Sequence, residues 1–104
     1  MIRILHSDSR YYPLMYCDCC EERITEPGMA MVMFDADPAE GQTCGVIHLH
    51  KGSCDRAMQQ KVGNKFGWAE LSHHVCDLVA NIGLPPTKLV EVEKDFSEFR
   101  QFLP

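Results

Sequence analysis

The chain has 104 residues, a length typical of a single domain. Hydrophobic residues make up 45% of it and charged residues 24%, as in ordinary globular proteins, and the formal net charge is −5. An acidic balance argues against tight nonspecific binding to nucleic acid, which needs many cations to neutralise phosphates. No apolar run approaches the roughly 18 residues that cross a bilayer, and residues 1–10 lack the apolar core of a secretory signal. We therefore expect a cytoplasmic protein with no membrane partner.

The segment before the first cysteines is predicted to be extended. Residues 2–5 are typical of a short strand, and residues 6–10 of a polar loop. In residues 11–16, Pro13 disfavours a helix and biases Tyr12 toward β geometry. After the cysteines, the run Glu26-Pro27-Gly28 indicates a turn.

A β-hairpin is predicted between residues 29 and 49. Residues 29–34 form the first strand, with the methionines on one face and Ala30, Val32 and Phe34 on the other. The acidic segment 35–41 contains proline and glycine and suits a hairpin loop. Residues 43–49 are then the return strand, paired antiparallel with the first.

Helices are predicted in the rest of the chain. Ser53 suits the N-cap of a helix over 54–62, which Gly63 ends. The clearest helix covers 68–82, where apolar residues recur at steps of three and four from Trp68, which we expect to dock this helix on the core. In the tail, a capping-box pattern favours a helix over 95–102, and 88–93 is compatible with either a strand or a helix.

Six cysteines in a chain without a signal peptide favour metal binding over disulfides. Two residues separate Cys17 from Cys20, and three separate His50 from Cys54. These are the spacings of two ligand pairs that close on one tetrahedral Zn²⁺. Two alternatives stay open, because Cys19 is adjacent to the first pair and His48 lies on the same strand face as His50. Cys44 and Cys76 are expected to be small buried thiols without a role.

The order of a cysteine knuckle, a hairpin and a helix with the last ligand in its first turn resembles the treble-clef zinc finger, a family that includes the fingers of LIM domains. The resemblance covers about residues 14–63. It implies that Cys17 and Cys20 are the knuckle ligands, and that His50 and Cys54 bind from the hairpin end and the helix start. The fold class expected is α+β, one domain with a zinc-finger half (1–63) and a helical half (64–104) whose helices pack on the finger.

Four protein ligands leave no open position for water, so the expected zinc site is structural and the protein is predicted not to be an enzyme. The resemblance implies an interaction platform, and the partner expected is another protein. A nucleic-acid-binding regulator is the alternative, because residues 51–65 carry a net charge of +3 from Lys51, Arg56, Lys61 and Lys65 against Asp55. No small-molecule substrate is indicated.

Overall fold

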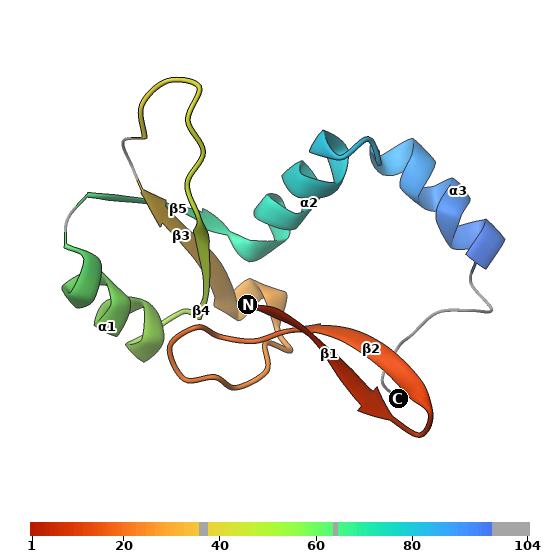
Figure 1. Ribbon diagram of the computed structural model, residues 1–104, viewed down its shortest axis with the longest axis horizontal. Helices are drawn as coiled ribbons and strands as arrows, with labels where there is room; N and C mark the ends of the chain where they lie inside the picture. The colour runs from red at the N-terminus through yellow and green to blue at the C-terminus, as the bar shows by residue number, and fades with distance from the viewer. Residues whose placement is uncertain (36–37, 64, 97–104) are drawn as a thin grey trace.

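The computed structural model describes residues 1–104 except 36–37, 64 and 97–104. It is a mixed α/β domain with two antiparallel sheets, β1–β2 and β4–β3–β5 (Figure 1). The elements in chain order are β1 (Ile2–Ser7), β2 (Arg10–Met15), the 3₁₀ turn η1 (Pro27–Met29), β3 (Ala30–Asp35), β4 (Val46–His50), α1 (Ser53–Val62), β5 (Phe66–Glu70), α2 (Leu71–Asn81) and α3 (Pro86–Phe96).

The first two strands form a hairpin that is longer than the sequence predicts. β1 pairs with β2 from Ile2 opposite Met15 to Ser7 opposite Arg10, so most of the expected polar loop 6–10 is strand. The turn consists of Asp8 and Ser9, with φ of 51° and 62°. Two successive left-handed residues are typical of a type I′ turn, whose twist matches that of the flanking strands.

β3 is the central strand of the second sheet, and both of its faces are buried. On one face Met31 and Met33 pack with Leu49 and, from α1, with Met58. On the other face Ala30 and Val32 pack with Leu71 at the start of α2. The predicted strand 29–34 and its antiparallel return strand are thus confirmed, although β4 begins only at Val46.

The helix predicted over 68–82 is wrong in its first three residues. Phe66–Glu70 is strand β5, which pairs antiparallel with β3, and the helix begins at Leu71. This pairing brings Gly67 against the ring of Phe34, where a Cβ would lie 2.3 Å from Phe34 Cε2. Trp68 is 55% exposed, so it does not dock a helix on the core as expected. Contact with a strand distant in sequence decides the structure here over the local helical pattern.

The C-terminal helices project from the sheet instead of packing their apolar stripes on it (Figure 1). α2 buries Leu71, but Ile82 at its end is 65% exposed. The open segment 88–93 is helical within α3, and residues 97–102 of the predicted last helix lie outside the described residues. Further large apolar side chains on these helices are exposed, namely Val75, Leu78, Leu89, Val90 and Val92.

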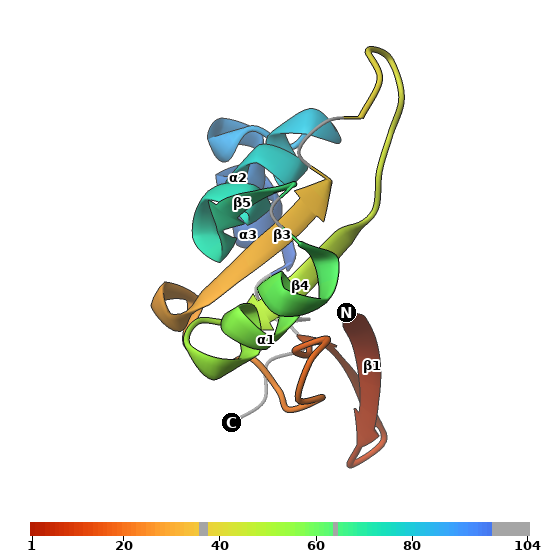
Figure 2. The same ribbon diagram turned by 90° about the vertical axis from the view of Figure 1, so that its left-hand side faces the viewer.

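The molecule is extended for its length. Its radius of gyration is 15.7 Å, against about 13 Å for a compact domain of this size. The chain at 38–45, between β3 and β4, also projects beyond the sheet in both views (Figures 1 and 2). Among the described residues, no helix has both the length and the apolar character needed to cross a membrane.

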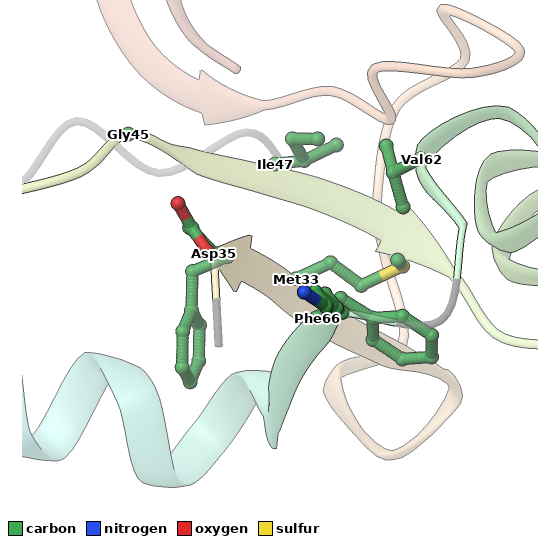
Figure 3. A pocket seen from close by; sticks show the side chains of 8 residues that line it. Met33, Asp35, Gly45, Ile47, Val62 and Phe66 are labelled. Atoms are coloured by element: carbon green, nitrogen blue, oxygen red, sulfur yellow. The ribbon is translucent and has the colours of Figure 1, made fainter. Parts of the chain in front are cut away.

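The sheet face that carries α1 is incompletely filled at the C-terminal end of that helix. A hollow of about 360 Å³ opens there, lined by apolar side chains that include Met33, Ile47 and Val62 (Figure 3). Asp35 and Lys65 also line it. This hollow is at the opposite end of α1 from the cysteine cluster described below.

The contact between Gly67 and Phe34 predicts a sharp cost for one methyl group. We expect Gly67→Ala to lower the free energy of unfolding by about 1–3 kcal/mol, because the added Cβ overlaps the Phe34 ring. The measurement is the urea unfolding midpoint. Gly45→Ala is the matched control, since its Cβ meets nothing within 4 Å. Phe34→Leu should restore part of the loss in the Gly67→Ala background, and equal midpoints for the two alanine variants would contradict the contact.

Candidate metal centre

A tight turn after β2 presents the first two thiols. The Cys17 N–H donates to the Glu22 carbonyl at 2.9 Å, and the Glu21 N–H donates to the Cys17 carbonyl at 3.0 Å. Glu21 has a φ of 62°, a left-handed conformation that usually falls to glycine. The chain therefore reverses immediately after Cys20. Cys17 is fully buried, whereas Cys20 is exposed.

The junction between β4 and α1 presents the other two donors. β4 ends at His50, and α1 begins at Ser53, with Cys54 in its first turn. Gly52 makes the turn between them with a φ of 104°, a conformation that side chains rarely adopt. The Asp55 carboxylate accepts a hydrogen bond from the Gly52 N–H and so caps the helix, in place of the expected Ser53 N-cap.

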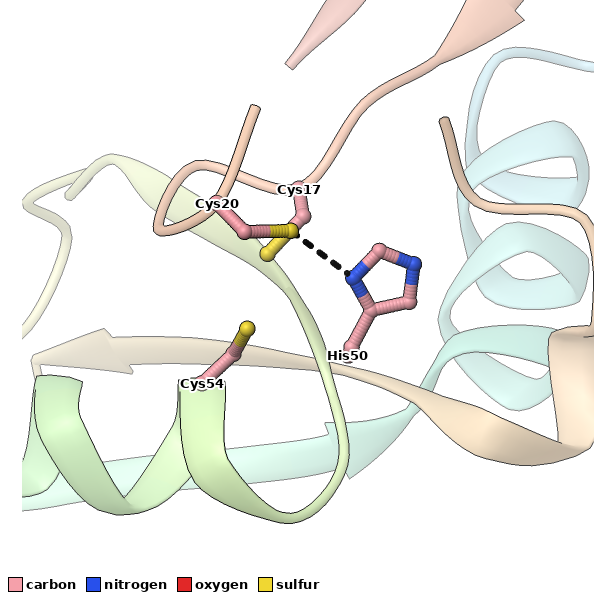
Figure 4. Close-up of side chains that lie close together, drawn as sticks. All are labelled: Cys17, Cys20, His50 and Cys54. Carbon is pink, nitrogen blue, oxygen red and sulfur yellow. Dashed lines mark hydrogen bonds between the residues drawn. The ribbon is translucent and has the colours of Figure 1, made fainter. Parts of the chain in front are cut away.

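These four residues converge. One ligand atom each from Cys17, Cys20, His50 and Cys54 lie within 4.8 Å of one another (Figure 4). Cys20 Sγ is 3.4 Å from His50 Nδ1. The edges of a tetrahedron with metal–sulfur and metal–nitrogen bonds of about 2.0–2.3 Å measure roughly 3.3–3.8 Å. The predicted set is therefore brought together as a Cys₃His cluster that can hold a metal ion.

The His50 ring is oriented for ligation by a backbone carbonyl. Its Nε2 lies 3.3 Å from the carbonyl oxygen of Arg23. A carbonyl can only accept, so Nε2 carries the proton and Nδ1 presents its lone pair to the thiols. A ligating histidine commonly donates its second ring N–H in this way, which fixes the tautomer and raises the basicity of the ligand.

Asp18 fastens the cysteine turn to β4. Its N–H donates to the His48 carbonyl at 2.7 Å, and its Oδ2 accepts the His48 N–H at 2.7 Å. Asp18 follows Cys17 directly, and His48 is two residues before His50. This reciprocal pair of hydrogen bonds therefore sets the distance between the two halves of the cluster.

The thiols compete for negative charge. Burial alone would raise the pKa of Cys17, but the backbone N–H groups of Cys20, His50 and Cys19 outweigh it and lower the pKa to about 6. Cys54 has its pKa raised to about 12, first by burial and then by the neighbouring Cys17 and Cys20. One thiolate is thus favoured and a further one opposed. A divalent cation would relieve this repulsion and keep all three sulfurs deprotonated.

The structure separates His48 from the predicted ligands but leaves Cys19 beside them. His48 is buried, and its Nδ1 lies 3.1 Å from the Met1 amino nitrogen and 3.7 Å from Asp18 Oδ2, so it does not replace His50 in the cluster. Cys19 is exposed beside the cluster, and its N–H donates to Cys17 Sγ at 3.4 Å. Cys44 and Cys76 are exposed and not buried as expected.

Comparisons of the chain with protein-family models, with curated proteins and with solved structures gave no match. The function must therefore be argued from the geometry of this molecule.

Removing the Asp18 carboxylate tests how the cluster is positioned. We expect Asp18→Ala to weaken binding of Zn²⁺ about 10- to 100-fold, because the turn loses its side-chain bond to β4. Competition with a chromogenic chelator measures the affinity. Asp77→Ala, which removes an exposed carboxylate from α2, is the control and should bind as the parent does. Equal affinities for both variants would show that Asp18 has no part in holding the site.

Proposed function

We propose that this protein is a small, non-enzymatic zinc-binding module in which one Zn²⁺ is structural and which acts by contacting another protein. The observation that carries the proposal is the convergence of Cys17, Cys20, His50 and Cys54. Three thiolates and one imidazole are a common donor set of structural zinc sites. Four protein ligands leave no coordination position for a reacting water, which favours a structural over a hydrolytic metal.

We further propose that the metal-binding part is a treble-clef finger. The support is the order of elements: a cysteine turn, the β3–β4 pair, and then α1 with Cys54 in its first turn. In such an arrangement the metal joins the turn to the helix. Because a site of this kind does not exist in the unfolded chain, the free energy of metal binding contributes directly to folding.

Contact with another protein is supported by the exposed apolar surface. The described part of α2 and α3 carries several exposed large apolar side chains, and Ile82, just after α2, is the most exposed of this set. Soluble monomers rarely leave large contiguous apolar patches open, and such patches commonly mark interaction sites. A reducing compartment such as the cytoplasm suits this function, since all six cysteines are free thiols.

The alternative of a nucleic-acid-binding regulator receives less support. Lys51 of the basic segment forms an ion pair with Glu70, with Nζ 2.6 Å from Oε2. Arg56 Nε donates to the Gly52 carbonyl. Lys61 and Lys65 remain exposed on and just after α1, too few to neutralise the many phosphates that tight binding requires.

Zinc content decides the proposal. We expect purified, reduced protein to contain one zinc per chain, and Cys54→Ser to lose it and to unfold the N-terminal half. Elemental analysis and native mass spectrometry measure the metal, and circular dichroism measures the fold.

Cys76→Ser is the matched control, because it removes an exposed thiol of α2 outside the cluster and should keep the zinc. Zinc retained at full stoichiometry in Cys54→Ser would refute the ligand set. Parent protein that stays metal-free in the presence of zinc would refute the proposed function.

A further inference from the structure

A second feature, separate from the cysteine cluster, is a groove between α1 and β5. Its volume is about 610 Å³. Its polar and aromatic lining consists of Asp55 and Gln59 from α1, Phe66, Trp68 and Glu70 from β5, and Lys51 just after β4. Phe66, Trp68 and Glu70 alternate along β5 and therefore share the face of the sheet that α1 covers.

Trp68 is the aromatic surface of this groove. Its side chain is 55% exposed, although it belongs to a paired strand and sits opposite Met33. The indole face is the best aromatic partner for a cation. Tryptophan is also enriched among the residues that dominate protein interfaces. An exposed indole in a concave site can therefore anchor a ligand, and the nearby charges decide which kind of ligand.

The carboxylates of the groove outnumber its cation. Lys51 Nζ donates hydrogen bonds to both carboxylate oxygens of Glu70, at 2.7 Å and 2.6 Å. The Asp55 carboxylate accepts hydrogen bonds from the Gly52 N–H and from Gln59 Nε2, which fix its orientation. Among the described residues, no ion pair neutralises Asp55. The groove therefore combines an indole face with one excess negative charge, on a chain whose net charge is −5.

β5 also offers a backbone edge. It is the outer strand of the order β4–β3–β5, and within the described residues it pairs with β3 alone. An extended peptide can add to such an edge through main-chain hydrogen bonds, with side-chain pockets providing the specificity. The edge favours a polypeptide ligand over a small free cation.

We propose that this groove binds an arginine side chain of an extended segment of a partner protein. The guanidinium stacks on Trp68, and its N–H groups reach the carboxylates of Asp55 and Glu70. Arginine is favoured over lysine because its planar cation stacks on aromatic rings and bonds carboxylates through two parallel N–H groups. The inference rests on the proposed function only in that the partner is a protein.

The test uses the zinc-loaded protein and short blocked peptides of alanine and glycine with one central arginine, citrulline, lysine or glutamate. Trp68 is the single tryptophan of the chain, so its emission reports directly on the groove. We expect a saturable change with the arginine peptide. The citrulline peptide, which keeps the shape and loses the charge, should bind roughly three- to tenfold more weakly.

Two variants fix the sign of the charge effect. Asp55→Asn should weaken binding of the arginine peptide by a similar factor. Asp77→Asn on α2 should leave that binding unchanged. Lys51→Met keeps the apolar stem of the side chain but frees Glu70 from its ion pair. This variant should therefore bind the arginine peptide more tightly. An anionic ligand would respond to Lys51→Met in the opposite sense.

The proposal is overturned if the arginine peptide gives no saturable response, if citrulline or glutamate binds as well, or if Lys51→Met weakens the arginine peptide. Zinc content is measured on the same samples, which separates the two proposals. If zinc-loaded protein does not bind the arginine peptide, the groove proposal is wrong and the zinc-module proposal is unaffected. Absence of zinc refutes the metal module, and arginine binding that persists without zinc leaves the groove standing.

Discussion

The arrangement of the candidate metal centre depends on the reciprocal hydrogen bonds between Asp18 and the backbone of His48. They join the cysteine turn, near the start of the chain, to strand β4, near the middle of the chain. Sheet pairing then places β4 beside β3, and Gly52 directs the chain into α1. The cluster is therefore a consequence of tertiary pairing as well as of cysteine spacing.

The electrostatics of the cluster favour one thiolate and oppose a second. Backbone N–H groups favour a thiolate at Cys17, whereas burial and the neighbouring Cys17 and Cys20 side chains oppose a second one at Cys54. A divalent ion would replace this repulsion by three attractive contacts. This is the physical reason to expect a high affinity from a site that is only partly shielded from solvent.

Local pattern was enough to predict much of this structure. The four residues of the cluster, the β3–β4 pair and α1 follow from cysteine and histidine spacing, alternation along 29–34 and a glycine-bounded helix. Local pattern failed where contacts distant in sequence determine the secondary structure. The helical steps that run from Leu71 to Ile82 continue by chance to Trp68, and only the pairing of β5 with β3 reveals a strand there. Strand parity likewise left His48 and His50 equivalent, and only nearness to the helix start favoured His50. The structure separates them by the His48 ring, whose Nδ1 lies 3.1 Å from the Met1 amino nitrogen.

α1 links the two sites. Cys54 belongs to the candidate metal centre, and the next residue, Asp55, lines the groove beside Trp68. The first turn of α1 must be formed for both, since the Asp55 carboxylate holds the Gly52 N–H that ends the His50 segment. A metal that anchored Cys54 would therefore also fix the carboxylate on which the proposed arginine recognition depends. A ligand that needs Asp55 in this position favours the folded first turn of α1 and should therefore raise the affinity for the metal. By linkage the effect is reciprocal, because binding at one site orders a turn that binding at the other site also requires.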